Sequence, residues 1–324
     1  MIVALMAVVG LPLAYWAGYV HEHAWGFSTQ SPDGWVLDRA KGLAVGLVLT
    51  GGALIAFVAA AHVWTSAWPA VIAGAAAALV LVLGLVAPLV LEPLFNHFEP
   101  LGDTGLAESL RALADRAGVP VRDVLVADAS RRTRKVNAYV SGLGRTRRVV
   151  VFDTLLAEAD APELHLVVAH ELGHRRARHV AKQTVLGMLG AAAFVLAAWA
   201  LLSWGALLSA LEARDAGDPR VVPFVLLLGS VLGLATSPLG AALSRRWERQ
   251  ADGFSLDLTA DAAAFESTHR RLALANLADL DPPRPAYVFW FTHPTPPERI
   301  AYGRRRSSAR MRTGRSLLPI PGRP

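Results

Sequence analysis

Long uncharged stretches alternate with polar blocks along this chain. Residues 1–20 carry no charged side chain, and residues 42–91 contain no Asp, Glu, Lys or Arg. A helix that crosses a bilayer needs about 20 apolar residues. The first stretch therefore predicts one span, and the second predicts two spans with a break near 64–69. Residues 183–211 and 221–244 predict two more spans, which gives five in all.

The intervening blocks have the composition of soluble protein. Residues 21–41 are polar and are expected to form a loop. Further on, the pattern predicts an amphipathic helix over Thr104–Ala117, ended by Gly118 and Pro120. Runs rich in valine at 124–127 and 148–152 predict two strands. We therefore expect a mainly α, polytopic membrane protein with a mixed soluble part that holds helices and a small β-sheet.

Composition supports the membrane class. Apolar residues make up 53% of the 324 residues and charged residues only 18%, below the roughly 25% of a typical soluble domain. The chain contains no cysteine, which excludes disulfides and cysteine-based metal sites, so a metal would need His, Asp or Glu ligands. Only three of the 32 basic residues are lysine. Such an arginine excess in an Ala-, Gly- and Pro-rich chain indicates a GC-rich, bacterial source.

The basic residues predict an orientation. The net charge is +6, but no aromatic residues interleave with the basic clusters, so we expect no nucleic-acid partner. If the soluble blocks face the cytoplasm and the N-terminus lies outside, only Arg214 and Arg220 lie on the outer side. The positive-inside rule favours that arrangement in a bacterial plasma membrane, with the soluble part in contact with membrane lipid.

The most informative motif is His170-Glu171-Leu172-Gly173-His174. On a helix, residues four apart lie on one face, so both imidazoles can bind one zinc ion while Glu171 reaches a water beside it. Asp160, Pro162 and Glu163 predict the start of that helix. The alternative is a helix that carries two histidines by chance.

A catalytic zinc site needs a third protein ligand. Glu248 is the candidate, because it follows the last predicted span on a continuing helix. Asp252 is one turn further on the same face and could fix the tautomer of a ligand imidazole. The alternative for Glu248 is a surface ion pair with Arg245. Both ligand segments adjoin the same predicted hairpin, so we expect the metal at the membrane–cytoplasm boundary.

Several motifs in one order resemble the integral-membrane type I CAAX prenyl proteases, a branch of the gluzincin metallopeptidases. The matching segments are listed in chain order: Glu22 with Gly26–Gln30, Pro93–Asn96 with Phe98 and Pro100, Asn137–Tyr139 with Gly142, Val151–Leu156, His170–His174, Glu248 with Ala251 and Asp252, and Thr292–Pro294 with Glu298 and Arg299. The resemblance covers about residues 10–303.

The resemblance implies roles for individual residues. It implies that His170, His174 and Glu248 bind one zinc ion per chain and that Glu171 is the catalytic base. It also implies that Asn137, Ala138 and Tyr139 lie on an edge strand that binds an extended substrate. It further implies that His293 and Arg299 contact the substrate or the developing oxyanion. The alternative for His293 is a structural histidine beside Pro294.

The function implied is a zinc metalloendopeptidase that cleaves near the C-terminus of a peptide or protein substrate, prenylated or unmodified. The alternatives are a membrane quality-control protease of the heat-shock type and, from another class, a non-catalytic scaffold or transporter. Family members usually have seven spans, whereas this chain begins at the position of the third, so we expect an N-terminally shortened variant or a start placed too late.

The expected organisation has five regions: membrane helices 1–91, the first catalytic part 92–181, a transmembrane hairpin 182–244, the second catalytic part 245–303 and a basic tail 304–324. We expect the tail to be a disordered anchor to anionic lipid. Five further histidines show no partner pattern and are expected at the surface or in loops: His21, His23, His97, His165 and His179. His269 is expected to be solvated on a helix, near Arg270 and Arg271.

Overall fold

The computed structural model of the chain describes residues 2–142 and 144–313. It divides into two compact units, each made of two chain segments. The first comprises residues 1–87 and 182–236, and the second comprises residues 88–181 and 237–324. Three long helices, α5, α9 and α11, contribute residues to both units.

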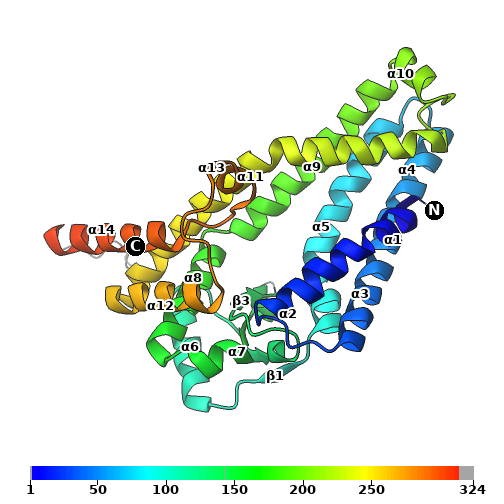
Figure 1. Ribbon diagram of the computed structural model, residues 1–324. Coiled ribbons are helices and arrows are strands. Elements are labelled where there is room, and N and C mark those ends of the chain that lie inside the picture. The colour runs from blue at the N-terminus through cyan, green and yellow to red at the C-terminus, as the bar shows by residue number, and fades with distance from the viewer. Residues whose placement is uncertain (1, 143, 314–324) are drawn as a thin grey trace. The chain divides into compact units, whose positions relative to one another are not determined.

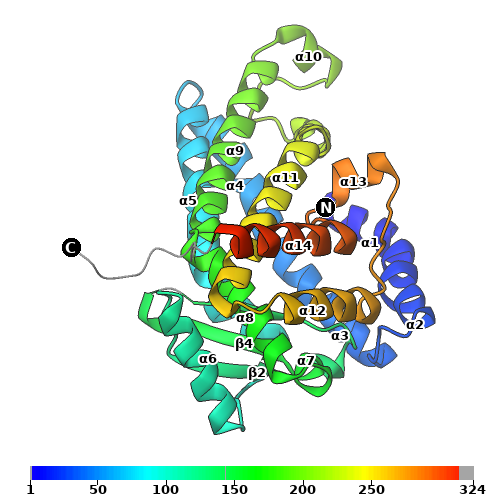
Figure 2. The same ribbon diagram turned by 90° about the vertical axis from the view of Figure 1, so that its left-hand side faces the viewer.

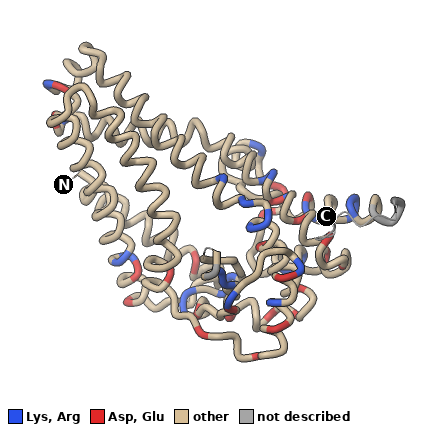
Figure 3. The backbone as a smooth tube through the Cα atoms, turned by 180° about the vertical axis from the view of Figure 1, so that it is seen from behind, with Lys and Arg blue, Asp and Glu red and all other residues tan. Residues whose placement is uncertain are grey.

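The first unit is helical (Figure 1). In chain order these are α1 (Ile2–Tyr15), α2 (Glu22–Ala24), α3 (Pro32–Gly46), α4 (Gly52–Val63), α5 (Trp68–Phe95), α9 (His179–Leu202), α10 (Gly205–Ala210) and α11 (Val222–Thr259). π-Helical turns at Trp16–His21 and Leu47–Gly51 join α1 to α2 and α3 to α4. Figure 3 shows few charged residues along the parts of the long helices that belong to this unit.

Among the residues that the structure describes, five helical stretches are long and apolar enough to span a membrane: Ile2–Ala24, Pro32–Val63, Trp68–Phe95, His179–Leu202 and Pro219–Thr259. The number agrees with the sequence prediction, and the predicted break between the second and third spans falls between Val63 and Trp68. Phe57 and Trp68 pack edge to face across that break with ring centroids 5.4 Å apart. The chain is therefore an integral membrane protein, mainly α-helical.

Two predicted boundaries are wrong. The loop expected over residues 21–41 already contains the start of α3, because the Ser31 hydroxyl caps the helix by accepting from Gly34 N–H and Pro32 occupies its first turn. The fourth span ends at Leu202 rather than residue 211. Trp204 adopts an extended conformation there, so Gly205–Ala210 forms a separate short helix.

The second unit contains a four-stranded sheet with the order β1-β2-β4-β3. The strands are β1 (Phe98–Pro100), β2 (Asp123–Ala127), β3 (Ala138–Ser141) and β4 (Arg148–Phe152). β2 and β4 are parallel, and the two outer pairs are antiparallel. β2 and β4 confirm the two predicted strands, and β3 forms one edge of the sheet.

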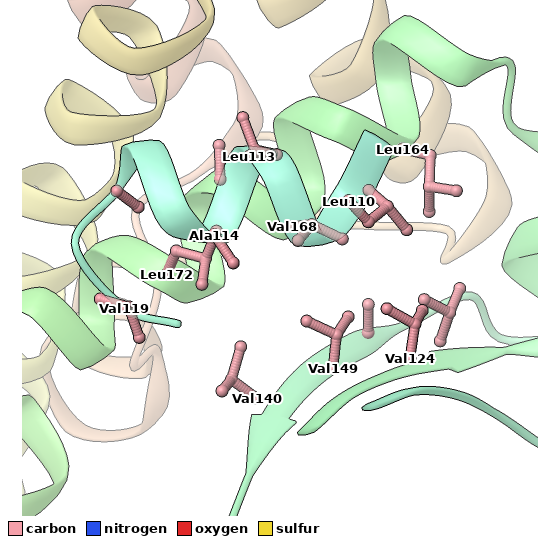
Figure 4. Close-up of a cluster of buried hydrophobic side chains, with 14 of the residues drawn as sticks. Leu110, Leu113, Ala114, Val119, Val124, Val140, Val149, Leu164, Val168 and Leu172 are labelled. Atoms are coloured by element: carbon pink, nitrogen blue, oxygen red, sulfur yellow. The ribbon is translucent and has the colours of Figure 1, made fainter. Parts of the chain in front are cut away.

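The second unit also contains six helices within the described residues: α6 (Thr104–Arg116), α7 (Asp153–Glu158), α8 (Ala161–Arg176), α12 (Ala262–Ala275), α13 (Arg284–Trp290) and α14 (Pro296–Thr313). Figure 4 shows α6 and α8 over one face of the sheet, with Leu113 and Val168 above Val124 and Val149. α12 packs against both α8 and α14 (Figure 2).

The basic tail differs from its prediction. Helix α14 continues past residue 303 to Thr313, because Arg304 pairs with Glu266 and Arg306 pairs with Asp257. Residues 314–324 of the expected tail lie outside the described residues.

Candidate metal centre

Helix α8 carries the two histidines of the motif. Asp160 caps its N-terminus by accepting from Glu163 N–H, and Pro162 lies in the first turn, as predicted. The Glu163 carboxylate pairs with Arg271 of α12 at 2.8 Å and so anchors the helix start. The rings of His170 and His174 then lie one turn apart, with their Nε2 atoms 3.1 Å from each other.

Glu248 of α11 faces both imidazoles. Its Oε2 lies 3.3 Å from Nε2 of His170, and its Oε1 lies 3.3 Å from Nε2 of His174. The three residues offer ligand atoms that all lie within 4.8 Å of one another, and Glu248 is buried. The alternative of a surface ion pair is wrong, because the Arg245 guanidinium instead donates to the Tyr287 and Phe291 carbonyls.

This arrangement fits a zinc ion. Ligands at about 2.0–2.1 Å in tetrahedral geometry lie roughly 3.3–3.4 Å from each other, which matches these separations. The buried Oε2 of Glu248 makes no hydrogen bond within the described part of the chain. A buried carboxylate oxygen without a hydrogen-bond donor is costly unless a cation lies next to it. Two imidazoles and one carboxylate are also the donor set of a known catalytic zinc class.

Asp252 supports the first imidazole. Its Oδ1 lies 2.9 Å from Nδ1 of His170, on the side of the ring opposite Nε2. Arg299 of α14 in turn donates from Nε to Asp252 at 2.9 Å and makes a second contact through Nη2. Burial disfavours a charged His170, but the adjacent carboxylates of Asp252 and Glu248 prevail and raise its pKa to about 9.

Glu171 lines a pocket of about 500 Å³ beside these ligands. Burial raises the pKa of the Glu171 carboxyl above its usual range, although the two neighbouring imidazoles oppose the shift. A carboxylate with a raised pKa is suited to accept and return a proton. The far wall of the pocket is apolar: Val136, Leu155, Leu166, Val167 and Leu272.

His293 and Arg299 also line this pocket. Nε2 of His293 lies 3.4 Å from Oε1 of Glu248, and its side chain is 61% exposed. Its Nδ1 lies 3.0 Å from the Thr292 hydroxyl, which holds the ring. Nη1 of Arg299 lies 3.8 Å from Oε2 of Glu248. The structure thus brings both predicted residues to the metal centre.

The edge strand β3 runs beside α8. Phe152 N–H donates to the Asn137 carbonyl, so by antiparallel alternation Tyr139 pairs with β4 while Ala138 and Val140 face away from it. Asn137 precedes the strand and lines the pocket. The Tyr139 side chain points elsewhere, with its hydroxyl 3.5 Å from Glu92. The outward backbone groups therefore belong to Ala138 and Val140. The sequence analysis did not include Val140 among the residues of the edge strand that face a substrate.

Sequence reasoning also missed one polar contact and the burial of two histidines in the second unit. Arg175 of α8 donates to the Val140 carbonyl and fastens the edge strand to the motif helix. His179 and His269 are buried, with 3% and 6% exposure, so the predictions of a surface or loop position for His179 and of a solvated position for His269 are wrong. Neither has a spacing that signals a polar partner, because the polar groups beside them come from other helices.

Comparison with known families agrees with this geometry. The model of peptidase family M48 matches residues 100–306. A second model, the CAAX prenyl protease N-terminal region with five membrane helices, matches residues 1–97. The chain therefore belongs to peptidase family M48 and is a membrane-embedded metalloprotease similar to the CAAX prenyl proteases.

Individual relatives point the same way. An uncharacterised metalloprotease of Bacillus subtilis, YhfN, is 30% identical over 318 residues, covering 94% of this chain and 72% of that protein. CAAX prenyl protease 1 of Saccharomyces cerevisiae is 32% identical over 187 residues, covering 57% of this chain and 41% of the enzyme. The crystal structure of S. mikatae Ste24p matches with a TM-score of 0.83 at 25% identity, covering 93% of this chain and 73% of that one.

The match to several curated enzymes is partial. The chain spans less than two thirds of the length of the Saccharomyces and Dictyostelium CAAX prenyl proteases, 41% and 61% respectively.

Proposed function

We propose that this chain hydrolyses peptide bonds with one zinc ion held by His170, His174 and Glu248. The observation that carries the proposal is the mutual spacing of 3.1–3.3 Å between their ligand atoms, beside a carboxylate of raised pKa. A zinc ion bound there would act as a Lewis acid toward a water molecule and the scissile carbonyl.

Glu171 is the proposed general base. It is next to His170 in the chain and reaches into the same pocket, so it can accept the proton of the attacking water. It then delivers that proton to the leaving amine. His293 donates from Nε2 toward the oxygen that gains negative charge, because its ring lines the same pocket beside Glu248.

The proposed substrate is an extended peptide that adds to β3. Ala138 and the N–H of Val140 face away from β4, which is the geometry of strand addition, whereas the Val140 carbonyl already accepts from Arg175. Asn137 contacts the chain where it enters the pocket, and Tyr139 holds the strand through Glu92. Arg299 acts through Asp252, with Nη1 directed toward the site.

The family implies a peptide or protein substrate, and we propose cleavage near the C-terminus of a CAAX-type protein. The match to the CAAX prenyl protease N-terminal model supports this branch over the heat-shock alternative. Comparing a farnesylated C-terminal peptide with its unmodified form tests the choice, because equal cleavage of both would exclude prenyl recognition.

The test of the catalytic role is Glu171→Gln. This change keeps the volume of the side chain but removes the base, so we expect turnover to fall by at least about 100-fold while zinc content stays at one per chain. Glu108→Gln is the matched control, because Glu108 is exposed on α6. Full activity of Glu171→Gln, or no zinc in the unmodified protein, would contradict the proposal.

A further inference from the structure

The second imidazole of the metal centre has a partner of its own. Nδ1 of His174 lies 3.1 Å from Nδ1 of His179, whose side chain is buried. On the other side of that ring, Nε2 of His179 lies 3.0 Å from Oε1 of Gln250. The three nitrogens and the amide oxygen form one continuous series of polar contacts that ends at Gln250.

A break in the helix makes this contact possible. Residues five apart on a continuous helix are rotated by about 140° from each other and do not face one another. Helix α8 ends at Arg176, and Arg178 adopts a left-handed conformation with a φ of 57°. The chain changes direction there before α9 begins, so the His179 ring lies against the His174 ring.

Helix α11 completes the arrangement. The Trp247 ring stacks on His179 with centroids 5.0 Å apart and an interplanar angle of 12°. Trp247 and Gln250 flank Glu248 on the same helix, so α11 supplies the third metal ligand together with the support for His179. The stacking sets the plane of the His179 ring, and Gln250 sets its rotation within that plane.

We propose that His179 and Gln250 are positioning residues that fix the tautomer and orientation of His174. The proposal rests on the metal site proposed above. If Nε2 of His174 is the metal-binding atom, its proton is on Nδ1 and donates to the bare Nδ1 of His179. The proton of His179 is then on Nε2 and donates to the amide oxygen of Gln250. Each donor in this series of hydrogen bonds therefore has one acceptor.

The two ligand histidines are supported differently. His170 contacts the carboxylate of Asp252, which pairs with Arg299, whereas His174 contacts a neutral imidazole–amide chain. The neutral chain orients its ligand without adding a formal charge to the site. Removing it therefore leaves the charge of the centre unchanged and alters only the tautomer and direction of His174.

The test uses purified full-length protein and measures metal binding directly. His179→Phe keeps an aromatic ring against Trp247 but removes the acceptor, and Gln250→Ala removes the acceptor of His179 at an exposed position. Loss of such an outer partner typically lowers metal affinity about 10- to 100-fold. We expect that loss of zinc affinity in His179→Phe, a smaller loss in Gln250→Ala, and recovery in Gln250→Glu, which restores an acceptor.

Two further readouts separate positioning from a structural role. The d–d absorption of the Co²⁺-substituted protein should shift in His179→Phe, while its melting temperature without metal should stay close to that of the unmodified protein. His165→Gln is the control, because Nδ1 of His165 bonds only to the Ala161 carbonyl of its own helix among the described contacts.

Unchanged zinc affinity and an unchanged Co²⁺ spectrum in His179→Phe would overturn the inference and leave the metal site intact. A fall in melting temperature without metal, with affinity unchanged, would likewise overturn it, by showing that His179 only packs. No metal binding in the unmodified protein would instead overturn the proposed function and this inference with it.

Discussion

At the scale of single residues, His269 is a histidine held neutral inside the protein. It packs edge to face on Phe265 with centroids 4.3 Å apart, and its Nε2 lies 3.8 Å from Oδ1 of Asp252. Burial, together with the positive charge of Arg299, lowers the pKa of His269 to about 3, although Asp252 opposes the shift. The group therefore stays neutral in the folded chain where an unfolded histidine would titrate.

This predicts a loss of stability in mild acid. Below about pH 6.5 the unfolded chain binds a proton at residue 269, but the folded chain does not until pH nears 3, so stability falls as pH decreases. Between pH 6.5 and pH 5 the contribution is about 2 kcal/mol. His269→Gln should make the melting temperature less dependent on pH over that window, whereas His97→Gln, which changes an exposed ring, should not. Equal slopes for His269→Gln and the unmodified protein would contradict this assignment.

At the scale of elements, the close approach of α8 and α11 decides the metal geometry. Gly173 lies at their contact, and a Cβ there would come within 3.2 Å of Cα and 3.3 Å of the carbonyl oxygen of Ala251. Both are backbone atoms, so the helices themselves must separate to make room. Glu248 lies one turn before Ala251 on α11, and it would move away from the two imidazoles.

We therefore expect Gly173→Ala to weaken zinc binding by about 10-fold, and Gly173→Val to weaken it further. Tight binding requires that the ligand atoms of His170, His174 and Glu248 keep the separations of a tetrahedral zinc site. Melting temperature should change less in Gly173→Ala, since alanine favours the helix by up to about 1 kcal/mol. Gly190→Ala in α9 is the control, because a Cβ there meets nothing within 4 Å. Zinc titration of the three variants checks the order, and equal affinities would show that the helices tolerate the separation.

At the scale of the whole molecule, the remaining proposal concerns orientation in the membrane. The positive-inside rule places Arg175–Lys182 and Arg245–Arg249 in the cytoplasm, and leaves the turn around Arg214 and Arg220 outside. In the structure Arg220 contacts the Glu212 carbonyl, and Asp218 caps the start of the following helical turn. That turn therefore folds within its own unit.

Single-cysteine labelling tests this topology cleanly, because the chain has no native cysteine. In intact bacterial cells, a membrane-impermeant maleimide should label Ser209→Cys but should label Ala157→Cys only after the membrane is opened. Both residues are exposed, so access to the thiol depends on the side of the membrane. The reverse labelling pattern would place the metal centre outside the cytoplasm.

The sequence alone determined the features that depend on local chemistry. Four uncharged stretches, one of them long enough for two spans, predicted five spans, since only an apolar helix can satisfy its backbone in lipid. The i, i+4 spacing of His170 and His174 predicted a shared face, and Glu248 was found because it follows a span on a continuing helix. Capping by Asp160 was predictable for the same reason, because it involves only neighbours in the chain.

Tertiary structure decided what depends on other segments. His179 meets His174 only because Arg178 breaks the helix and α11 brings Gln250, and no spacing in the chain encodes that approach. His269 is buried by helices far from it in sequence, and the arginines after residue 303 are ordered by distant carboxylates. Periodicity specifies which face of a helix is apolar, but the partner of each polar side chain follows from how the helices pack.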